Sequence, residues 1–203
     1  MSEDSPGSRE LRGAGPSVDA SNIPVLNTQR LQLRAFTLGD LPAACALWAD
    51  EAVVRFIGGK PRTQAEVWTA VARGFGHWAL LGYGFWVIAD KATNAYLGEI
   101  GYLEALRDLK PPHTGEWIGA PEAGWALSQQ AWGQGIASEA LEAINLWSDR
   151  NLDAKHTLCL IDPDHAASLR VAEKNGYQQF RMAQLGEEPT VVLTRLRQSG
   201  TLT

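Results

Sequence analysis

The sequence predicts one α/β (α+β) domain, in which a sheet is flanked by helices. Three observations lead to this fold class. A buried strand, a glycine-bearing turn and an amphipathic helix follow one another over residues 122–147. Strand-like and helical segments precede this unit, and the chain closes with two alternating segments typical of a hairpin. The chain has 203 residues, 45% of them hydrophobic, which is enough for one sizeable core and does not suggest a second.

The N-terminal residues 1–22 differ in composition from the rest. They are rich in Ser, Gly and Pro and carry no periodic apolar residues, so we expect a disordered tail. Residues 23–203 then form the single domain.

Regular patterns mark the segments between the tail and the central unit. In order, they are a strand over 25–36, a helix begun by Asp40 with Pro42 in its first turn, a helix over 63–82, and paired strands over 84–89 and 95–103 joined by a turn at 91–94. Residues 104–121 contain three prolines and two glycines and predict a long loop. That loop either borders a binding site, through Arg107 and Trp117, or is a mobile surface insertion.

The central unit has the composition of an anion site. Glu122–Leu127 reads as a strand, and the turn that follows carries Gly133 and Gly135. From residue 136 the pattern is helical: one face holds Ile136, Ala140, Leu141, Ile144 and Trp147, and the other holds Glu139, Glu142, Asn145 and Asp149. The first N–H groups of a helix have no intrahelical partner, and glycine lets a ligand approach the backbone. No Lys or Arg lies between Lys110 and Arg150. An anion bound at this turn would therefore be held mainly by backbone amides and the helix dipole.

The sequence of this turn admits several interpretations. A dinucleotide-binding G-x-G-x-x-G motif needs a third glycine where Ser138 stands, and a P-loop needs a following Gly-Lys-Ser/Thr. An ordinary strand-to-helix connection remains an alternative. The hexapeptide Gln130–Gly135, Q-A-W-G-Q-G, matches Gln/Arg-x-x-Gly-x-Gly/Ala without a gap and resembles the acetyl-CoA pyrophosphate loop of the GNAT N-acetyltransferase superfamily. The wider strings E-A-G-W-A-L and W-G-Q-G-I-A-S-E-A-L resemble the branch that includes the Rim-type ribosomal-protein acetyltransferases.

The C-terminal part strengthens the resemblance. A strand is expected over 156–161, a helix opened by Pro163 and Asp164 and stopped at Asn175-Gly176, and a hairpin over 177–182 and 190–196. The block D-P-D-H-A-A-S-L-R-V-A-E-K-N-G-Y at 162–177 is similar to the last conserved block of that family. Together the elements number about seven strands and four helices, in the order of the GNAT fold. The resemblance implies a mixed, mostly antiparallel sheet splayed at its two central parallel strands.

The resemblance also implies a site. The residues expected to bind acetyl-CoA are Leu127, Gln130, Ala131, Trp132, Gly133, Gln134, Gly135, Ile136, Ala137, His165 and Ser168. His165 stands where the family usually has Asn, and Ala172 where many relatives have a proton-donating Tyr. Ser168 is therefore the candidate general acid, with an ordinary helix serine as the alternative. Arg170 and Lys174 either reach the outer phosphates or form a solvated helix face.

Amine acetylation also needs an oxyanion donor and a base. By resemblance, the donor is the backbone N–H of Leu127. Glu122, Glu99 and Glu187 are the candidate bases, with Glu122 slightly ahead, and each has a solvated carboxylate as its alternative.

The expected function is acetyl-CoA-dependent transfer of an acetyl group to a primary amine, either a protein N-terminus or a small molecule. The alternative is a non-catalytic acyl-CoA-binding or interaction module. A net charge of −5 argues against a nucleic-acid partner. Cys45 and Cys159 read as buried hydrophobes, and the scattered histidines suggest no metal. The sequence lacks a secretory or membrane-spanning pattern, which predicts a cytoplasmic protein with no membrane partner, and a homodimer stays open.

Overall fold

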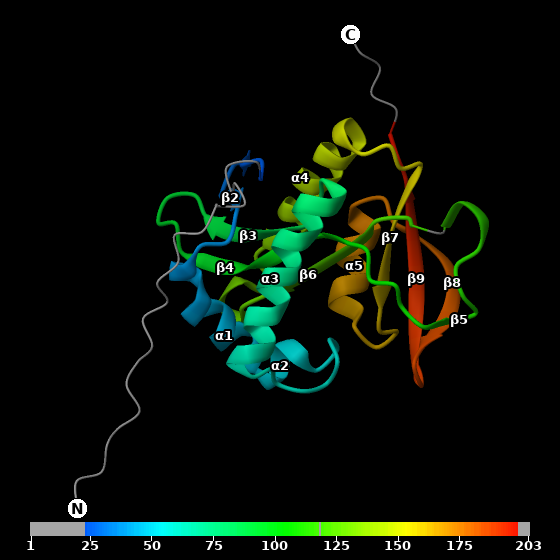
Figure 1. Ribbon diagram of the computed structural model, residues 1–203, viewed down its shortest axis with the longest axis horizontal. Coiled ribbons are helices and arrows are strands. Elements are labelled where there is room, and N and C mark those ends of the chain that lie inside the picture. Colours follow the sequence, from blue (N-terminus) through cyan, green and yellow to red (C-terminus); the bar gives the residue numbers. More distant parts are fainter. Residues whose placement is uncertain (1–22, 118, 199–203) are drawn as a thin grey trace, which may run out of the picture.

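The computed structural model describes residues 23–117 and 119–198, which form one continuous sheet with helices on both faces (Figure 1). The predicted tail at residues 1–22 lies outside the described residues. The sheet order is β1-β2-β3-β4-β6-β7-β9-β8-β5. The strands are β1 Leu26–Asn27, β2 Leu31–Arg34, β3 Phe85–Asp90, β4 Tyr96–Leu103, β5 Leu109–Lys110, β6 Glu122–Leu127, β7 His156–Ile161, β8 Gln178–Leu185 and β9 Glu188–Leu196.

Within the described residues, five α-helices cover the two faces of this sheet. They are α1 Leu41–Ala49, α2 Glu51–Val54, α3 Gln64–Leu81, α4 Ile136–Asn151 and α5 Ala166–Lys174. The first three share a small core around Trp48 and Val67. The last two pack on the other face, where α4 contributes Leu141 and Ile144 to the main core.

The predicted fold class is confirmed, with two more strands than expected. The first predicted strand is divided into β1 and β2 by a turn at 28–30. The second extra strand, β5, lies in the segment 104–121 that was predicted to be a loop throughout. Leu109 anchors it because this side chain is buried against Ala183 and Val192.

Helix α3 follows its sequence signals closely. Thr63 and Glu66 form a capping box, in which each side chain accepts from the backbone N–H of the other residue. Gly82 ends the helix in a left-handed conformation, as predicted for a glycine at this position. Asp40 precedes α1 as expected, but its carboxylate binds Arg34 and Thr37 rather than capping that helix.

The two central parallel strands, β6 and β7, separate soon after they meet. Glu122 pairs with Leu158, and no later residue of β6 pairs with β7. On its other edge β6 pairs with β4 along its whole length. The predicted splay is therefore present, and it opens toward the C-terminal end of β6.

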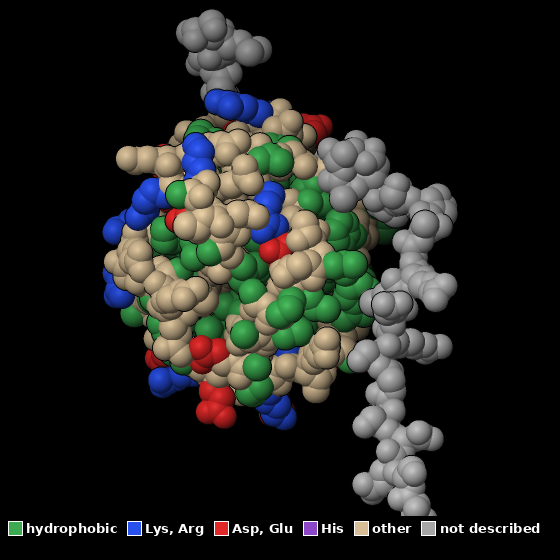
Figure 2. Space-filling view, turned by 90° about the vertical axis from the view of Figure 1, so that its left-hand side faces the viewer, with side chains coloured by type: hydrophobic (Ala, Val, Ile, Leu, Met, Phe, Trp, Pro, Cys, Tyr) green, Lys and Arg blue, Asp and Glu red, His purple; other side chains and the backbone are tan. Residues whose placement is uncertain are grey.

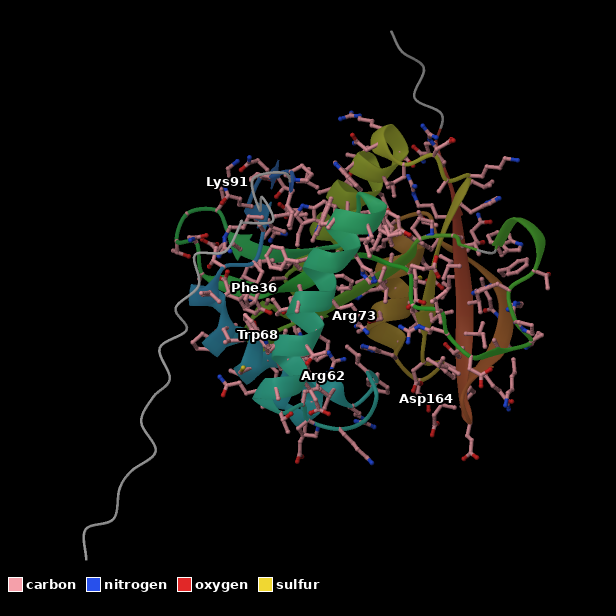
Figure 3. The ribbon with its side chains drawn as sticks, in the orientation of Figure 1. Phe36, Arg62, Trp68, Arg73, Lys91 and Asp164 are labelled. Atoms are coloured by element: carbon pink, nitrogen blue, oxygen red, sulfur yellow. The ribbon has the colours of Figure 1, made fainter. Side chains whose placement is uncertain are left out.

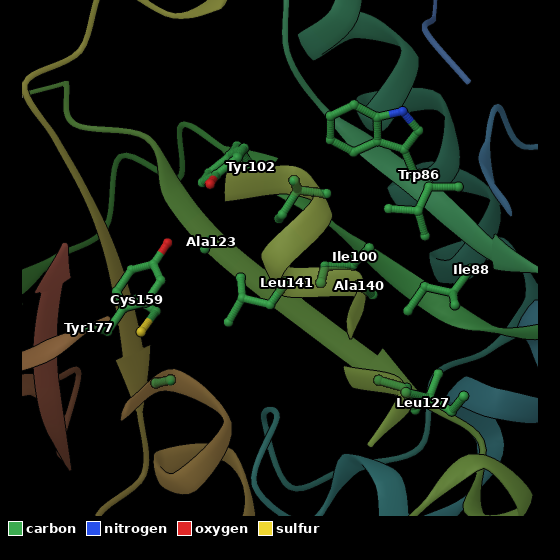
Figure 4. Close-up of a cluster of buried hydrophobic side chains, with 14 of the residues drawn as sticks. Trp86, Ile88, Ile100, Tyr102, Ala123, Leu127, Ala140, Leu141, Cys159 and Tyr177 are labelled. Carbon is green, nitrogen blue, oxygen red and sulfur yellow. The ribbon is translucent and has the colours of Figure 1, made fainter. Parts of the chain in front are cut away.

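The main core lies between the sheet and α4 (Figure 4). It also contains a buried polar network. The hydroxyl of Tyr102 donates to Asn145 Oδ1 at 2.8 Å, and that of Tyr177 donates to the same atom at 3.2 Å. The expected placement of Asn145 on the polar face of α4 is wrong. Its amide is buried because it satisfies two tyrosine hydroxyls, one from β4 and one from the residue that precedes β8.

The surface seen from the sheet edge at β2 mixes hydrophobic side chains with Lys and Arg that lie mostly toward the rim (Figure 2). No helix within 23–117 and 119–198 is both long and apolar enough to cross a membrane.

Candidate active site

A cavity of about 710 Å³ lies where β6 and β7 separate. Residues of β3, β4, β6 and β7 line it, together with the segment between α2 and α3, the inner side of α3 and the start of α5. The cavity therefore extends from the gap between β6 and β7 to the face of the sheet that α1–α3 cover. Ligand pockets of small molecules have volumes of this order.

The splay leaves one edge of β6 open for hydrogen bonding. The N–H of Ser128 donates to the carbonyl of Leu97 in β4. Because hydrogen bonds alternate along an antiparallel pair, the N–H groups of Leu127 and Trp125 point the opposite way, toward the splay. The Leu127 N–H, the predicted oxyanion donor, thus lies at the open edge.

The loop after β6 presents backbone amides as predicted. Gly133 and Gly135 have φ values of 71° and 77°, in the left-handed region that favours glycine. Buried Ala131 and Ile136 anchor the two ends of the loop, while the residues between them are exposed. The first intrahelical bond of α4 is made by the Glu139 N–H, so the three preceding amides are free to bind an anion.

Side chains within the loop hold its shape. Trp132 Nε1 donates to the carbonyl of Leu127 at 2.8 Å, and Gln134 Nε2 donates to the carbonyl of Gln130 at 2.6 Å. Ala137 is half-buried behind the loop and packs on the main core. The predicted phosphate-binding residues are thus brought together in one preformed turn.

Arg30, which sequence reasoning missed, supplies a cation to this loop. Its Nη1 donates to the carbonyl of Gln134 at 2.9 Å, and its Nε and Nη2 each approach Glu139 Oε2 at 2.7 Å. Burial raises the pKa of Glu139, but hydrogen bonds from Thr28 and Arg30 outweigh it and the pKa is lowered. Glu139 lies in the first turn of α4, where its charge would repel a bound phosphate unless Arg30 balanced it. No local signal identifies Arg30, since it is more than a hundred residues from the loop in sequence.

Helix α5 brings two predicted residues to the cavity. Ser168 is half-buried and lines the cavity, and its Oγ makes no hydrogen bond within the described part of the chain. His165 precedes the helix and stacks on Phe56, with ring centroids 4.4 Å apart. Burial lowers the pKa of His165, which favours the neutral imidazole. Ala172 is fully buried in the core, so no proton donor comes from that position.

The three candidate bases occupy different environments. Glu122 is buried and its carboxylate accepts from Arg107 Nε at 3.0 and 2.8 Å and from Nη2 at 2.6 Å. Both carboxylate oxygens of Glu122 are thus occupied by the Arg107 guanidinium, and the geometry favours a different carboxylate as the base. Glu187 is exposed at the tip of the β8–β9 hairpin and does not line the cavity.

Glu99 is the carboxylate that the geometry favours as a base. It lines the cavity from β4, and it accepts from the Tyr96 hydroxyl at 2.7 Å and from Trp48 Nε1 at 3.4 Å. Burial raises the pKa of Glu99, and these hydrogen bonds together with nearby Arg62 lower it by less. A carboxylate with a raised pKa is better matched to accepting a proton near neutral pH.

The loop at 104–121 contributes Arg107 to the cavity wall, while Trp117 lies elsewhere and its ring packs at a tilt against those of His156 and Phe180. Arg170 and Lys174 are exposed on α5 and do not line the cavity. Across 23–117 and 119–198 there is no cluster of three His, Cys, Asp or Glu side chains that could hold a metal ion.

Comparison with known proteins decides the family. Residues 30–178 match the family described as "Acetyltransferase (GNAT) domain". The chain belongs to the GNAT acetyltransferase family. This GNAT protein is an acetyltransferase, as the sequence predicted.

Individual relatives agree with that assignment. The acetyltransferase is 28% identical over 177 residues to the uncharacterized protein YkkB of Bacillus subtilis, covering 84% of this chain and 94% of YkkB. A solved structure of a putative GnaT-family acetyltransferase from Bordetella pertussis superimposes with a TM-score of 0.72 at 25% identity, covering 85% of this chain and 99% of that one. The ribosomal L7/L12 alpha-N-protein acetyltransferase RimL, in complex with coenzyme A, has a TM-score of 0.69 at 19% identity, covering 87% and 99%. The predicted likeness to the Rim-type branch is thus confirmed at the level of the fold.

Proposed function

We propose that this protein transfers an acetyl group from acetyl-CoA to a primary amine by direct attack of the amine on the thioester. The observation that carries the proposal is one cavity containing Glu99, the open edge of β6 and the unbonded hydroxyl of Ser168. The phosphates of CoA would bind the amides of residues 133–138, and its pantetheine arm would enter the splay.

The residues divide the chemistry between them. An amine is largely protonated at neutral pH, and Glu99 takes its proton, directly or through a water. As the new N–C bond forms, the N–H of Leu127 donates to the developing oxyanion. When the C–S bond breaks, Ser168 Oγ gives a proton to the departing thiolate and recovers, through water, the proton that the new amide nitrogen loses, while Glu99 releases its own proton to solvent. The acetylated amine and free CoA are the products.

The test follows both thiol release and acetylated product with a panel of primary amines. Glu99→Gln should lower kcat/KM by about 10²–10⁴-fold, while acetyl-CoA affinity is retained. Glu142→Gln, which removes an exposed carboxylate on α4, is the matched control and should behave as wild type.

Two outcomes would oppose the proposal. Tight acetyl-CoA binding without acetylation of any amine would identify an acyl-CoA-binding module instead. An active enzyme indifferent to Glu99→Gln would remove Glu99 from the mechanism, and Glu187→Gln would then test the other free carboxylate.

A further inference from the structure

One wall of the cavity is positively charged. Arg55 and Arg62 lie on the segment after α2, and Arg73 lies on the side of α3 that faces the cavity. Figure 3 shows Arg62 and Arg73 on the side of α3 nearer to α5. Within 23–117 and 119–198, none of these three guanidinium groups forms an ion pair.

Arg62 and Glu99 flank a single side chain without touching each other. The guanidinium carbon of Arg62 lies 3.7 Å from the ring centroid of Trp48, stacked on its face. The same indole donates from Nε1 to Glu99 Oε2 at 3.4 Å. A cation and a proton acceptor are therefore held about one indole ring apart at the surface of one cavity.

The positive groups on this wall repel one another. Burial lowers the pKa of Arg62 and the charge of Arg73 lowers it further, against opposing effects of Glu99 and Glu66. Burial and Arg73 likewise lower the pKa of His77 on the next turn of α3. A bound anion would relieve this repulsion.

Three of the nearby acidic groups are engaged elsewhere. Glu122 is paired with Arg107, and Glu66 is held by the capping box with Thr63. Asp162 accepts from the N–H of Asp164 on the opposite side of the cavity. The protein thus offers Arg62 and Arg73 no carboxylate in contact.

Resting on the proposed function, we infer that the acceptor is a small amine that carries an anionic group, a carboxylate or a phosphate, a few bonds from its nitrogen. Arg62 and Arg73 bind the anionic group, and Glu99 receives the ammonium end. The separation of the two subsites by one indole fits a molecule of amino-acid size. Trp48 and Phe56 give the cavity aromatic surfaces for the rest of the acceptor.

The test compares acceptors that differ only in the anionic group. Phenylalanine, phenylalaninamide and phenethylamine form one series, and aminoethyl phosphate with ethanolamine forms another. The anionic member should have a kcat/KM at least about tenfold above its neutral partners, since hydrogen bonds to charged groups are the stronger ones. The series that responds distinguishes a carboxylate from a phosphate.

Variants of the arginines in the cavity wall then test whether they cause the preference for anionic acceptors. Arg62→Gln should raise KM for the anionic acceptor by about tenfold to a hundredfold relative to KM for its neutral partners, measured side by side on the same variant. Arg150→Gln removes one exposed charge outside the cavity and is the matched control. If Arg62→Gln does not fold, exposed Arg73→Gln takes its place. Hydrocinnamate, a carboxylate without an amine, should compete with the acceptor in the wild type and less well in Arg73→Gln.

The outcomes separate two failures. Equal or better use of neutral amines, absence of competition by hydrocinnamate, or acetylation of acidic N-terminal peptides alone would overturn this inference and leave amine acetylation standing. Failure to acetylate any amine would instead overturn the proposed function itself.

Discussion

Arg30 is expected to control acetyl-CoA affinity through Glu139. In Arg30→Ala, the carboxylate of Glu139 loses its ion pair and stays in the first turn of α4, beside the proposed phosphate site. At a separation of about 8 Å, one such charge repels another by roughly 0.5–2 kcal/mol for effective dielectric constants between about 80 and 20. The affinity for acetyl-CoA should therefore fall by about 2- to 30-fold, toward the lower end because Arg30 is 45% exposed.

Calorimetric titration with acetyl-CoA measures this effect, and a double-mutant cycle identifies its cause. Glu139→Gln in the Arg30→Ala background should restore much of the affinity, since the unpaired charge is gone. The loss should also shrink as salt is raised, because the groups are partly exposed. Unchanged affinity in a folded Arg30→Ala protein, or no restoration by Glu139→Gln, would refute this reasoning.

Four further predictions concern the site and the chain end. Gly135→Val should greatly weaken acetyl-CoA binding, measured by calorimetry, because φ is 77° there; Gly186→Val, with φ of 64° at the β8–β9 tip, should affect only stability. Ser168→Ala should lower kcat and kcat/KM together, by about a hundredfold or less, and a change in melting temperature alone would favour a structural serine. The kcat/KM should rise as pH passes through the raised pKa of Glu99, and in Glu99→Gln this limb should move up to the pKa of the amine itself. Removing residues 1–20 should leave the melting temperature and cofactor affinity unchanged, and a large loss would show that the segment packs on the domain.

Local signals were sufficient where a function depends on backbone conformation. The loop Gln130–Gly135 needs two residues with positive φ, followed by the free amides of a helix, and both requirements are written in consecutive residues. The limits of α3 and the end of α5 at Lys174, shortly before left-handed Gly176, follow from signals within a few residues. The order of these elements carried the resemblance that predicted the fold.

Only the tertiary structure decided how charged and polar side chains pair. Glu122 and Glu99 lie on neighbouring strands and both face the cavity. Glu122 forms an ion pair with Arg107, whereas burial raises the pKa of Glu99. Arg30 reaches the phosphate loop, and Asn145 is buried by two tyrosines, through contacts between segments distant in sequence. Hydrophobic periodicity and helix caps indicate the conformation of the segment in which they occur. The ionisation of a side chain, and whether it is free to act in catalysis, depend instead on the neighbours that folding brings to it.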